Sequence, residues 1–250
     1  MHLHNFLVKL KTSSKGYPES TFGGKHRAYT CVNAFSYHIV RRNLETYNKL
    51  DGIFVDGIFM CKMLNWFWRL PIPRLSFDMT GIAPDLFSTL EKDGRSIYFI
   101  GAKPDEIRLS VENISSSYPA MKIAGYRDGY FKDSADRSRV IKELITQNPD
   151  FLIVGMGSPL QEKFAIDVRE AGYQGTVFTC GGFLHQSSAS IQYYPDWINK
   201  YNLRAFYRLY REKGMFRRLF NVLIQFPALF TYDTVRSYFS TRKQIEASKK

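Results

Sequence analysis

The stretch Asn148–Phe164, which reads NPDFLIVGMGSPLQEKF, predicts how this 250-residue chain folds. Within it, Phe151–Val154 is a short apolar run of the kind found in a strand that is covered on both faces. Gly155 and Gly157 follow the run, and glycine lets the backbone turn sharply or come close to a ligand. The stretch therefore predicts a buried strand that ends in a glycine-rich turn.

A helix is predicted to begin directly after these glycines. Ser158 has the side chain of an N-cap, Pro159 stands at the first helical position, and Gln161 completes a capping-box pattern. The free N–H groups of such a helix start suit a phosphate group. The same pattern is also typical of a tight strand-to-helix turn that binds no ligand, and the local sequence leaves both interpretations open.

Strands alternate with helices along most of the chain. The predicted strands are Tyr29–Val32, Gly52–Val55, Ser96–Ile100, Met121–Gly125, Phe151–Val154 and Thr176–Thr179. This alternation indicates an α/β fold, a Rossmann-like parallel sheet with helices on both faces. Gly101, Gly181 and Gly182 also fall just after strands and strengthen the prediction of a nucleotide cleft. Phe183–Tyr194 has no periodicity and is predicted to be a loop.

The two ends of the chain differ from this catalytic core, which is assigned to residues 29–200. Residues 1–28 have weak periodicity and are predicted to be peripheral, with one short strand at Asn5–Leu10. Residues 201–240 are predicted to form a basic amphipathic helical appendage, and residues 241–250 a disordered tail.

The net charge of +12 predicts an acidic partner, such as nucleic acid, anionic lipid or a phosphorylated substrate. Arg204, Arg208, Arg211 and Arg218 share one face of the predicted C-terminal helix, beside apolar aromatic residues. This arrangement favours an anionic membrane surface over a merely solvated face. The basic residues do not spread over a sheet face or a recognition helix, so no nucleic-acid partner is expected.

The remaining composition narrows the class of protein. The three cysteines, Cys31, Cys61 and Cys180, lack C-x-x-C spacing, which argues against zinc or disulfides and fits a reducing compartment. No apolar run reaches the ~18 residues that cross a bilayer. The chain does not open with the apolar core of a signal peptide. A cytoplasmic location is therefore expected.

Asp56 lies at the carboxyl end of the second predicted strand, just before a helix predicted at Ile58–Trp68. Open α/β sheets bind their ligands at this edge. The carboxylate can cap the following helix, which local sequence favours, or serve as a general base. In the proline-rich loop that follows, Arg74 and Asp78 fit either a surface ion pair or contacts to phosphate and sugar.

Taken together, these motifs resemble those of WecG/TagA/CpsF-type glycosyltransferases, glycosyltransferase family 26, over roughly Tyr29 to Phe220. The matching segments agree with the family in order and spacing: Val55–Gly57, Tyr98–Pro104, Gly129–Phe131, Pro149–Lys163 and Leu203–Arg218.

The resemblance implies an inverting transfer of a sugar from a UDP-sugar to a saccharide linked through pyrophosphate to a polyprenol. It implies no essential metal, no cofactor and a peripheral position on the inner face of the bacterial plasma membrane. The reaction belongs to the synthesis of surface polysaccharide. The donor sugar, the acceptor sugar and a possible homo-oligomer stay open.

The resemblance also assigns roles to residues. Asp56 is the expected general base, and Arg74 and Gln161 are expected at the donor or in catalysis. After the first strand, Asn33 is the closest match to a cleft-facing residue, with Thr30 as the alternative. The other residues expected to bind substrate are Gly57, Asp78, Gly101, Gly155, Gly157, Ser158, Gly181, Gly182, His185, Arg208, Arg217 and Arg218.

Two positions depart from the family pattern. Ser76-Phe77-Asp78-Met79 stands where the family has G-x-D-h, so the residue before Asp78 is bulky, and His185 replaces an aspartate after Gly181-Gly182. Both are expected near the sugar pocket, where they would affect which donor sugar fits. A dinucleotide-dependent oxidoreductase is the alternative function, although no G-x-G-x-x-G follows a first strand with an acid about 20 residues on.

Overall fold

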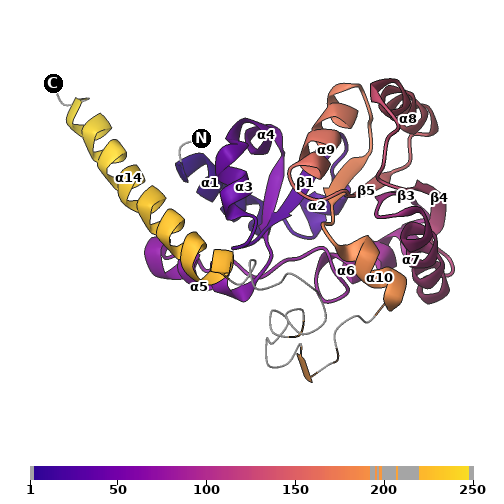
Figure 1. The fold of residues 1–250 in the computed structure, drawn as a ribbon, viewed down its shortest axis with the longest axis horizontal. Helices are drawn as coiled ribbons and strands as arrows, with labels where there is room; N and C mark the ends of the chain where they lie inside the picture. The colour runs from indigo at the N-terminus through magenta and orange to yellow at the C-terminus, as the bar shows by residue number, and fades with distance from the viewer. Residues whose placement is uncertain (1–2, 192–194, 196, 199–206, 208–219, 248–250) are drawn as a thin grey trace.

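The computed structural model describes residues 3–191, 195, 197–198, 207 and 220–247 (Figure 1). Its centre is a 6-stranded sheet in the order β2-β1-β6-β5-β3-β4, in which every paired neighbour is parallel. The strands are β1 (Arg27–Val32), β2 (Gly52–Val55), β3 (Ser96–Gly101), β4 (Lys122–Arg127), β5 (Phe151–Gly155) and β6 (Thr176–Thr179). They confirm the predicted α/β fold.

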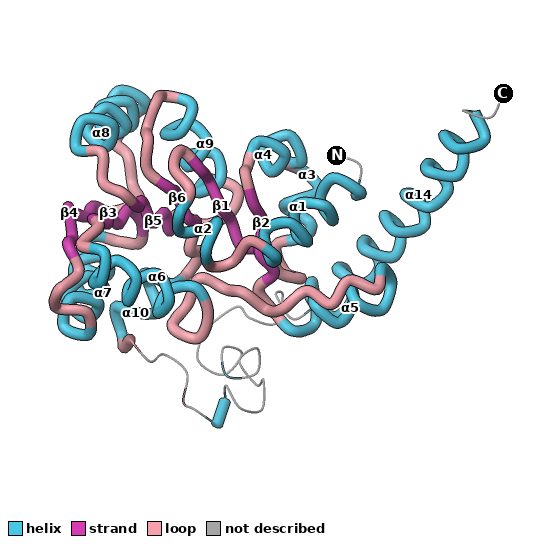
Figure 2. Tube along the Cα trace, turned by 180° about the vertical axis from the view of Figure 1, so that it is seen from behind, coloured by secondary structure: helices cyan, strands magenta, loops and turns pink. Residues whose placement is uncertain are grey.

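Helices cover both faces of this sheet (Figure 2). One hydrophobic core lies between the sheet and α1 (Leu3–Lys15), α3 (Tyr37–Arg42), α4 (Leu44–Lys49), α5 (Ile58–Trp68), α8 (Ser134–Gln147) and α9 (Leu160–Glu170). The other lies between the sheet and α2 (Glu19–Gly23), α6 (Ile82–Asp93), α7 (Pro104–Ser117) and α10 (Phe183–Ala189).

Strand β5 shows why its sequence is apolar throughout. Leu152 and Val154 point into the first core, while Phe151 and Ile153 point into the second. All four side chains are buried, because successive side chains of a strand face opposite sides of the sheet and both sides are covered. The continuous apolar run is the sequence signature of this central position.

The N-terminal segment corrects one prediction. Asn5–Leu10 belongs to helix α1, not to a strand, and α1 packs against β2. Phe6, Leu7 and Leu10 are buried in the first core. Their spacing follows one face of a helix, but the polar residues around them obscured this pattern in the sequence.

Helix α10 corrects a second prediction, because Phe183–Ala189 is helical rather than a loop. Phe183 and Leu184 enter the second core, and Ser187 and Ser110 place their hydroxyl oxygens 2.6 Å apart across the contact with α7. The helix is held by tertiary packing, and its 7 residues are too few to show a period.

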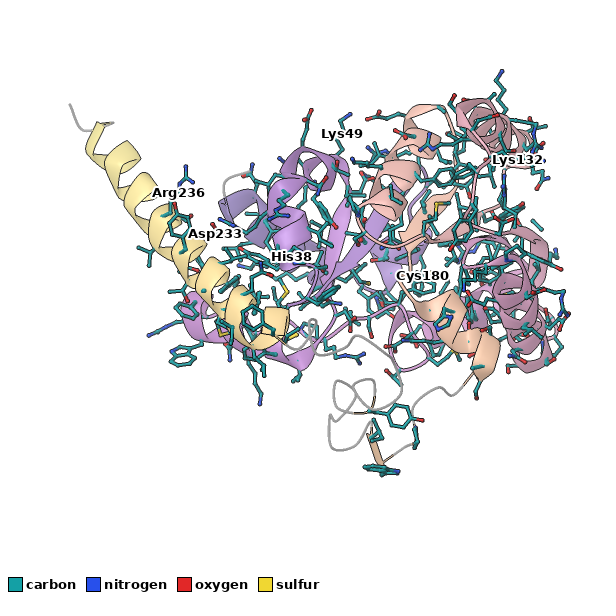
Figure 3. All side chains as sticks on the ribbon, in the orientation of Figure 1. His38, Lys49, Lys132, Cys180, Asp233 and Arg236 are labelled. Carbon is teal, nitrogen blue, oxygen red and sulfur yellow. The ribbon has the colours of Figure 1, made fainter. Side chains whose placement is uncertain are left out.

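The C-terminal part of the chain forms a π-helical turn, η1 (Asn221–Gln225), followed by the long helix α14 (Phe226–Ala247). Phe226 and Phe230 are buried against Tyr37 of α3. Asp233 faces the same helix and binds Arg41 through two nitrogens, at 2.7 and 3.0 Å (Figure 3). The far end of α14 extends away from the sheet (Figure 1).

Within the predicted disordered tail, residues 241–247 are helical, because α14 continues to Ala247. The polar residues from Thr241 onward include good helix formers, and extending an existing helix needs no new nucleus. The predicted basic helix with Arg208, Arg217 and Arg218 falls on residues 199–206 and 208–219, outside the described part of the chain.

Candidate active site

The parallel strands bring several predicted site residues to one edge of the sheet. Asp56 follows β2, Asn33 follows β1, Gly181 follows β6, and Gly155 and Gly157 lie at and after the end of β5. These four strands are consecutive neighbours in the sheet. Asp56 and the glycine turn after β5 are separated by three strand spacings, about 14 Å. The two features can therefore contact different parts of one substrate pair.

The Asp56 carboxylate is partly open, with 35% of the side chain exposed. Its Oδ2 lies 3.4 Å from Asn33 Nδ2, and its Oδ1 lies 3.5 Å from Arg74 Nη2. Helix α5 has Gly57 as its N-cap, with no side-chain cap bond. The carboxylate thus faces an amide and a cation at the sheet edge.

Arg74 is held between two carboxylates. Its Nη2 lies 2.8 Å from Asp78 Oδ2 and 2.5 Å from Ser76 Oγ, and the same nitrogen is the one that approaches Asp56. Asp78 in turn accepts hydrogen bonds from the backbone N–H and the hydroxyl of Thr80. Asp78 therefore holds the guanidinium beside Asp56 in an ion pair. Contacts of this loop to phosphate and sugar stay a prediction.

A buried polar cluster lies beneath the glycine turns. Glu162 is 0% exposed, and its Oε1 accepts hydrogen bonds from Thr30 Oγ1, Ser158 Oγ and Gln161 Nε2, each at 2.9 Å. Thr30 is also fully buried, with its hydroxyl 2.7 Å from that of Thr179. Thr30 therefore points into the protein rather than toward a ligand.

Among the described residues, two buried oxygens have no hydrogen-bond partner: Glu162 Oε2 and the hydroxyl of Tyr47. Burial, with the Glu162 carboxylate nearby, raises the pKa of Tyr47 and keeps it protonated. Sequence reasoning missed Glu162. Its signal is its position on the buried face of α9, where Phe164, Ala165 and Val168 also lie.

Gln161 joins two of the predicted turns. Its side-chain oxygen accepts the N–H of Gly181 at 3.1 Å, which ties the turn after β6 to the start of α9. Ser158 does not cap this helix, which begins at Leu160 after Pro159. The predicted capping box is wrong because the Ser158 hydroxyl donates to Glu162 instead of accepting from a backbone N–H.

The glycines of this edge fall into two groups. A Cβ on Gly101 would lie 2.3 Å from the Gly155 oxygen, and one on Gly155 would lie 2.9 Å from Cys180 Sγ, so packing explains both glycines. Gly157 and Gly181 instead have φ of +76° and +55°, and a Cβ there would meet no atom within 4 Å. Their backbones border open space, as an approaching ligand would need.

The two residues expected near the sugar pocket differ in their exposure to solvent. Phe77 is buried in the second core against Phe178 and Phe183. His185 is exposed on α10, with Nδ1 3.0 Å from Glu106 Oε1. Burial opposes ionisation of Glu106, but the Lys103 N–H and His185 lower its pKa overall.

The cysteines behave as apolar residues of the interior. Burial raises the pKa of Cys61 to about 11 and that of Cys180 to about 12, so both thiols stay protonated near neutral pH. Over the described ranges, no three His, Cys, Asp or Glu side chains gather in a way that could hold a metal ion. The described helices also include none that is both long and apolar enough to cross a membrane.

The profile of the glycosyl transferase family WecG/TagA/CpsF matches residues 19–243. The chain belongs to this family. Membership confirms the resemblance seen in the motifs and makes the protein a glycosyltransferase. The oxidoreductase alternative receives no support from it.

Individual relatives agree with this assignment. The UDP-Gal:alpha-D-GlcNAc-diphosphoundecaprenol beta-1,4-galactosyltransferase of Shigella boydii is 33% identical over 214 residues, 84% of this chain and 88% of that protein. The N-acetylglucosaminyldiphosphoundecaprenol N-acetyl-beta-D-mannosaminyltransferase of Bacillus subtilis is 34% identical over 172 residues, 68% of this chain and 64% of that protein. The Bacillus spizizenii protein of the same name is 28% identical over 142 residues, 55% of this chain.

Proposed function

We propose that this glycosyltransferase moves a hexosyl unit from a UDP-sugar to a sugar linked through diphosphate to a polyprenol, in bacterial cell-envelope polysaccharide synthesis. The relatives support the acceptor class, because the names of both kinds specify GlcNAc-diphosphoundecaprenol. The observation that carries the proposal is the Asp56 carboxylate, held at the sheet edge between Asn33 and Arg74.

In the proposed reaction, Asp56 takes the proton from an acceptor hydroxyl as that oxygen attacks the anomeric carbon of the donor sugar. The bond from this carbon to the UDP oxygen breaks as the new glycosidic bond forms. Attack and departure occur on opposite faces, so the configuration at the anomeric carbon inverts. A positioned general base contributes roughly 10²–10⁴-fold to such a step.

The departing UDP carries increasing negative charge, which has to be stabilised. Arg74 supplies a fixed cation beside the base. The open backbone at Gly157 and Gly181 is the proposed seat of the UDP phosphates. Arg208, Arg217 and Arg218 are proposed to add cations over the site. With these groups and no D-x-D motif in the sequence, the transfer is proposed to need no protein-bound metal.

The enzyme is proposed to work on the inner face of the plasma membrane, because its proposed acceptor is anchored there. The acceptor sugar would reach Asp56 from the membrane while UDP occupies the glycine turns. Selectivity among donor sugars is not assigned to Phe77, whose side chain is in the core.

One experiment tests the reaction. The protein is incubated with UDP-galactose, UDP-N-acetylmannosamine and other UDP-sugars, each with a GlcNAc-diphosphate-lipid analogue. UDP release and product mass are followed, with and without EDTA. The proposal predicts UDP release matched by one added hexosyl unit for at least one donor, unchanged by EDTA. Absence of transfer from every UDP-sugar contradicts it, and loss of transfer in EDTA contradicts metal independence.

A further inference from the structure

One oxygen of Glu162 accepts three hydrogen bonds that come from different parts of the site. Thr30 donates from β1, Ser158 from the turn after β5 and Gln161 from α9, each at 2.9 Å. Glu162 is fully buried, so its side chain does not reach a ligand bound over the edge of the sheet. Any part that Glu162 plays in the reaction is therefore exerted through the residues that it holds.

The contact with Glu162 decides which way the Gln161 amide points. Because Glu162 Oε1 accepts from the amide NH₂ group, the amide oxygen has to face the other way. There it accepts the N–H of Gly181 at 3.1 Å. With the amide reversed, that N–H would meet a second donor instead of an acceptor. Glu162 therefore holds the turn after β6 through Gln161.

A second chain of hydrogen bonds connects Glu162 to the end of β6. Thr30 has a single hydroxyl proton, which it donates to Glu162, so Thr179 has to be the donor in the 2.7 Å contact between the two threonines. Thr179 is the last residue of β6, two residues before Gly181. Glu162 is therefore linked to this turn along two routes, one through α9 and one through β1.

The turns that Glu162 holds are those whose backbone borders open space. Gly157 directly precedes Ser158, and a Cβ on Gly157 or Gly181 would meet no atom within 4 Å. A backbone that binds phosphate has to keep its N–H groups aimed at one point. Because no packing restrains these turns from outside, the hydrogen bonds from beneath supply the restraint.

Burying a carboxyl group costs free energy, which hydrogen bonds only partly offset here. Glu162 Oε2 has no partner in the part of the chain that the structure describes. Phe164, Ala165 and Val168, also buried on α9, are apolar. Apolar groups of the same shape can be about as stable as a buried polar cluster, so stability alone does not explain this carboxyl group.

We propose that Glu162 is a positioning residue of the transferase, which holds the turns after β5 and β6 in the arrangement that binds the diphosphate of the donor. The proposal rests on the proposed function, which places the UDP phosphates at Gly157 and Gly181. In Glu162→Ala, both turns would adopt other arrangements part of the time. If the competent one falls to about a tenth of the population, the apparent affinity for UDP falls about tenfold.

The test combines calorimetric titration with UDP and steady-state kinetics on the full chain. Glu162→Ala is expected to raise the Kd for UDP and the KM for the UDP-sugar about tenfold each. Its kcat at saturating donor should change little, because bound donor selects the competent arrangement and the base is intact. Glu162→Gln should restore the KM, since its amide oxygen replaces Oε1 and its nitrogen replaces an oxygen without a partner.

A second readout needs no ligand. Amide hydrogen exchange at Gly181, measured by NMR, should become about tenfold faster in Glu162→Ala. The N–H of Cys180 is the internal reference, because it bonds to the Val154 oxygen within the sheet at 2.8 Å. Leu144→Ala is the control matched for stability, since Leu144 is buried on α8 and its helix leads to the opposite end of β5.

Two results overturn the positioning role. One is a folded Glu162→Ala whose UDP affinity and Gly181 exchange equal those of wild type. The other is an equal loss of UDP affinity in Leu144→Ala, which would make general destabilisation the cause. If Glu162→Ala does not fold, Glu162→Met takes its place, because it fills the same space without an acceptor.

Failure of this inference differs from failure of the proposed function. Transfer by wild type with an unchanged KM in Glu162→Ala rejects the positioning role alone. Faster Gly181 exchange in Glu162→Ala, with a wild-type protein that neither binds UDP nor transfers from any UDP-sugar, rejects the proposed function and supports the hold of Glu162 on the turns.

Discussion

At the scale of single residues, the site depends on how charges are held in place. One nitrogen of Arg74, Nη2, contacts Asp78, Ser76 and Asp56. The planar guanidinium holds this nitrogen in a fixed direction. Asp78 therefore positions the cation, which can stabilise negative charge that develops beside the base.

Arg74→Ala is predicted to lower kcat roughly 10²-fold, since it removes one preorganised charge from the transition state. Arg74→Lys should recover part of this loss, because it keeps the charge but not the planar guanidinium. Steady-state UDP release measures both. Arg108→Ala, which removes an exposed arginine paired on α7, is the control. Wild-type kcat in Arg74→Ala would contradict the assignment.

Glu162 acts at the same scale but within the protein. Glu162→Ala is predicted to lower the free energy of unfolding by about 3 kcal/mol, because buried donors on Thr30, Ser158 and Gln161 lose their acceptor. Glu162→Gln keeps an acceptor oxygen and should cost less. Urea denaturation gives both values. A loss no larger than that of Glu112→Ala, an exposed glutamate, would show that the cluster is not structurally important.

At the scale of secondary-structure elements, the turns after β5 and β6 combine packing with open backbone. Gly155→Ala is predicted to cost about 1–3 kcal/mol of stability, because the added Cβ meets Cys180 and Leu184. Gly157→Ala meets no atom, although its positive φ costs about 1–2 kcal/mol. The new methyl group should nevertheless weaken UDP binding.

Calorimetric titration with UDP and urea denaturation together separate these two effects. Gly157→Ala should lose UDP affinity out of proportion to its loss of stability. UDP binding by Gly157→Ala as tight as that of wild type would contradict the placement of the phosphates at this turn.

The same elements show what could be predicted from sequence. Strand β5 was predictable because a strand covered on both faces has to be apolar at every position. Helix α10 was not, because its 7 residues are ordered by contact with α7. The importance of Asp56 and Arg74 was predicted from the ends of the strands and from the family motifs. The role of Glu162 could not be read locally, since its partners lie on β1 as well as α9.

At the scale of the whole molecule, the C-terminal helix is part of the fold. Phe226 and Phe230 pack between α3 and α5. Phe226 contacts Phe59, near the start of α5 and the proposed base. The sequence indicated an appendage, because the long-range contacts that dock it do not leave a local pattern.

Phe230→Ala is predicted to lower the free energy of unfolding by about 3–5 kcal/mol, as expected for a fully buried aromatic ring. Val235→Ala, on the exposed side of the same helix, should change it by less than about 0.5 kcal/mol. Chemical denaturation compares the two. Equal, small effects would mean that α14 does not dock as described.

The most direct test of the central claim is the turnover of Asp56→Asn with donor and acceptor at saturation, followed as UDP release. The change keeps the size of the side chain and one oxygen that can accept from Asn33 or Arg74, but it removes the carboxylate that would take the proton. The account predicts a rate roughly 10²–10⁴-fold below wild type, with UDP affinity retained. Turnover near the wild-type rate would contradict Asp56 as the base.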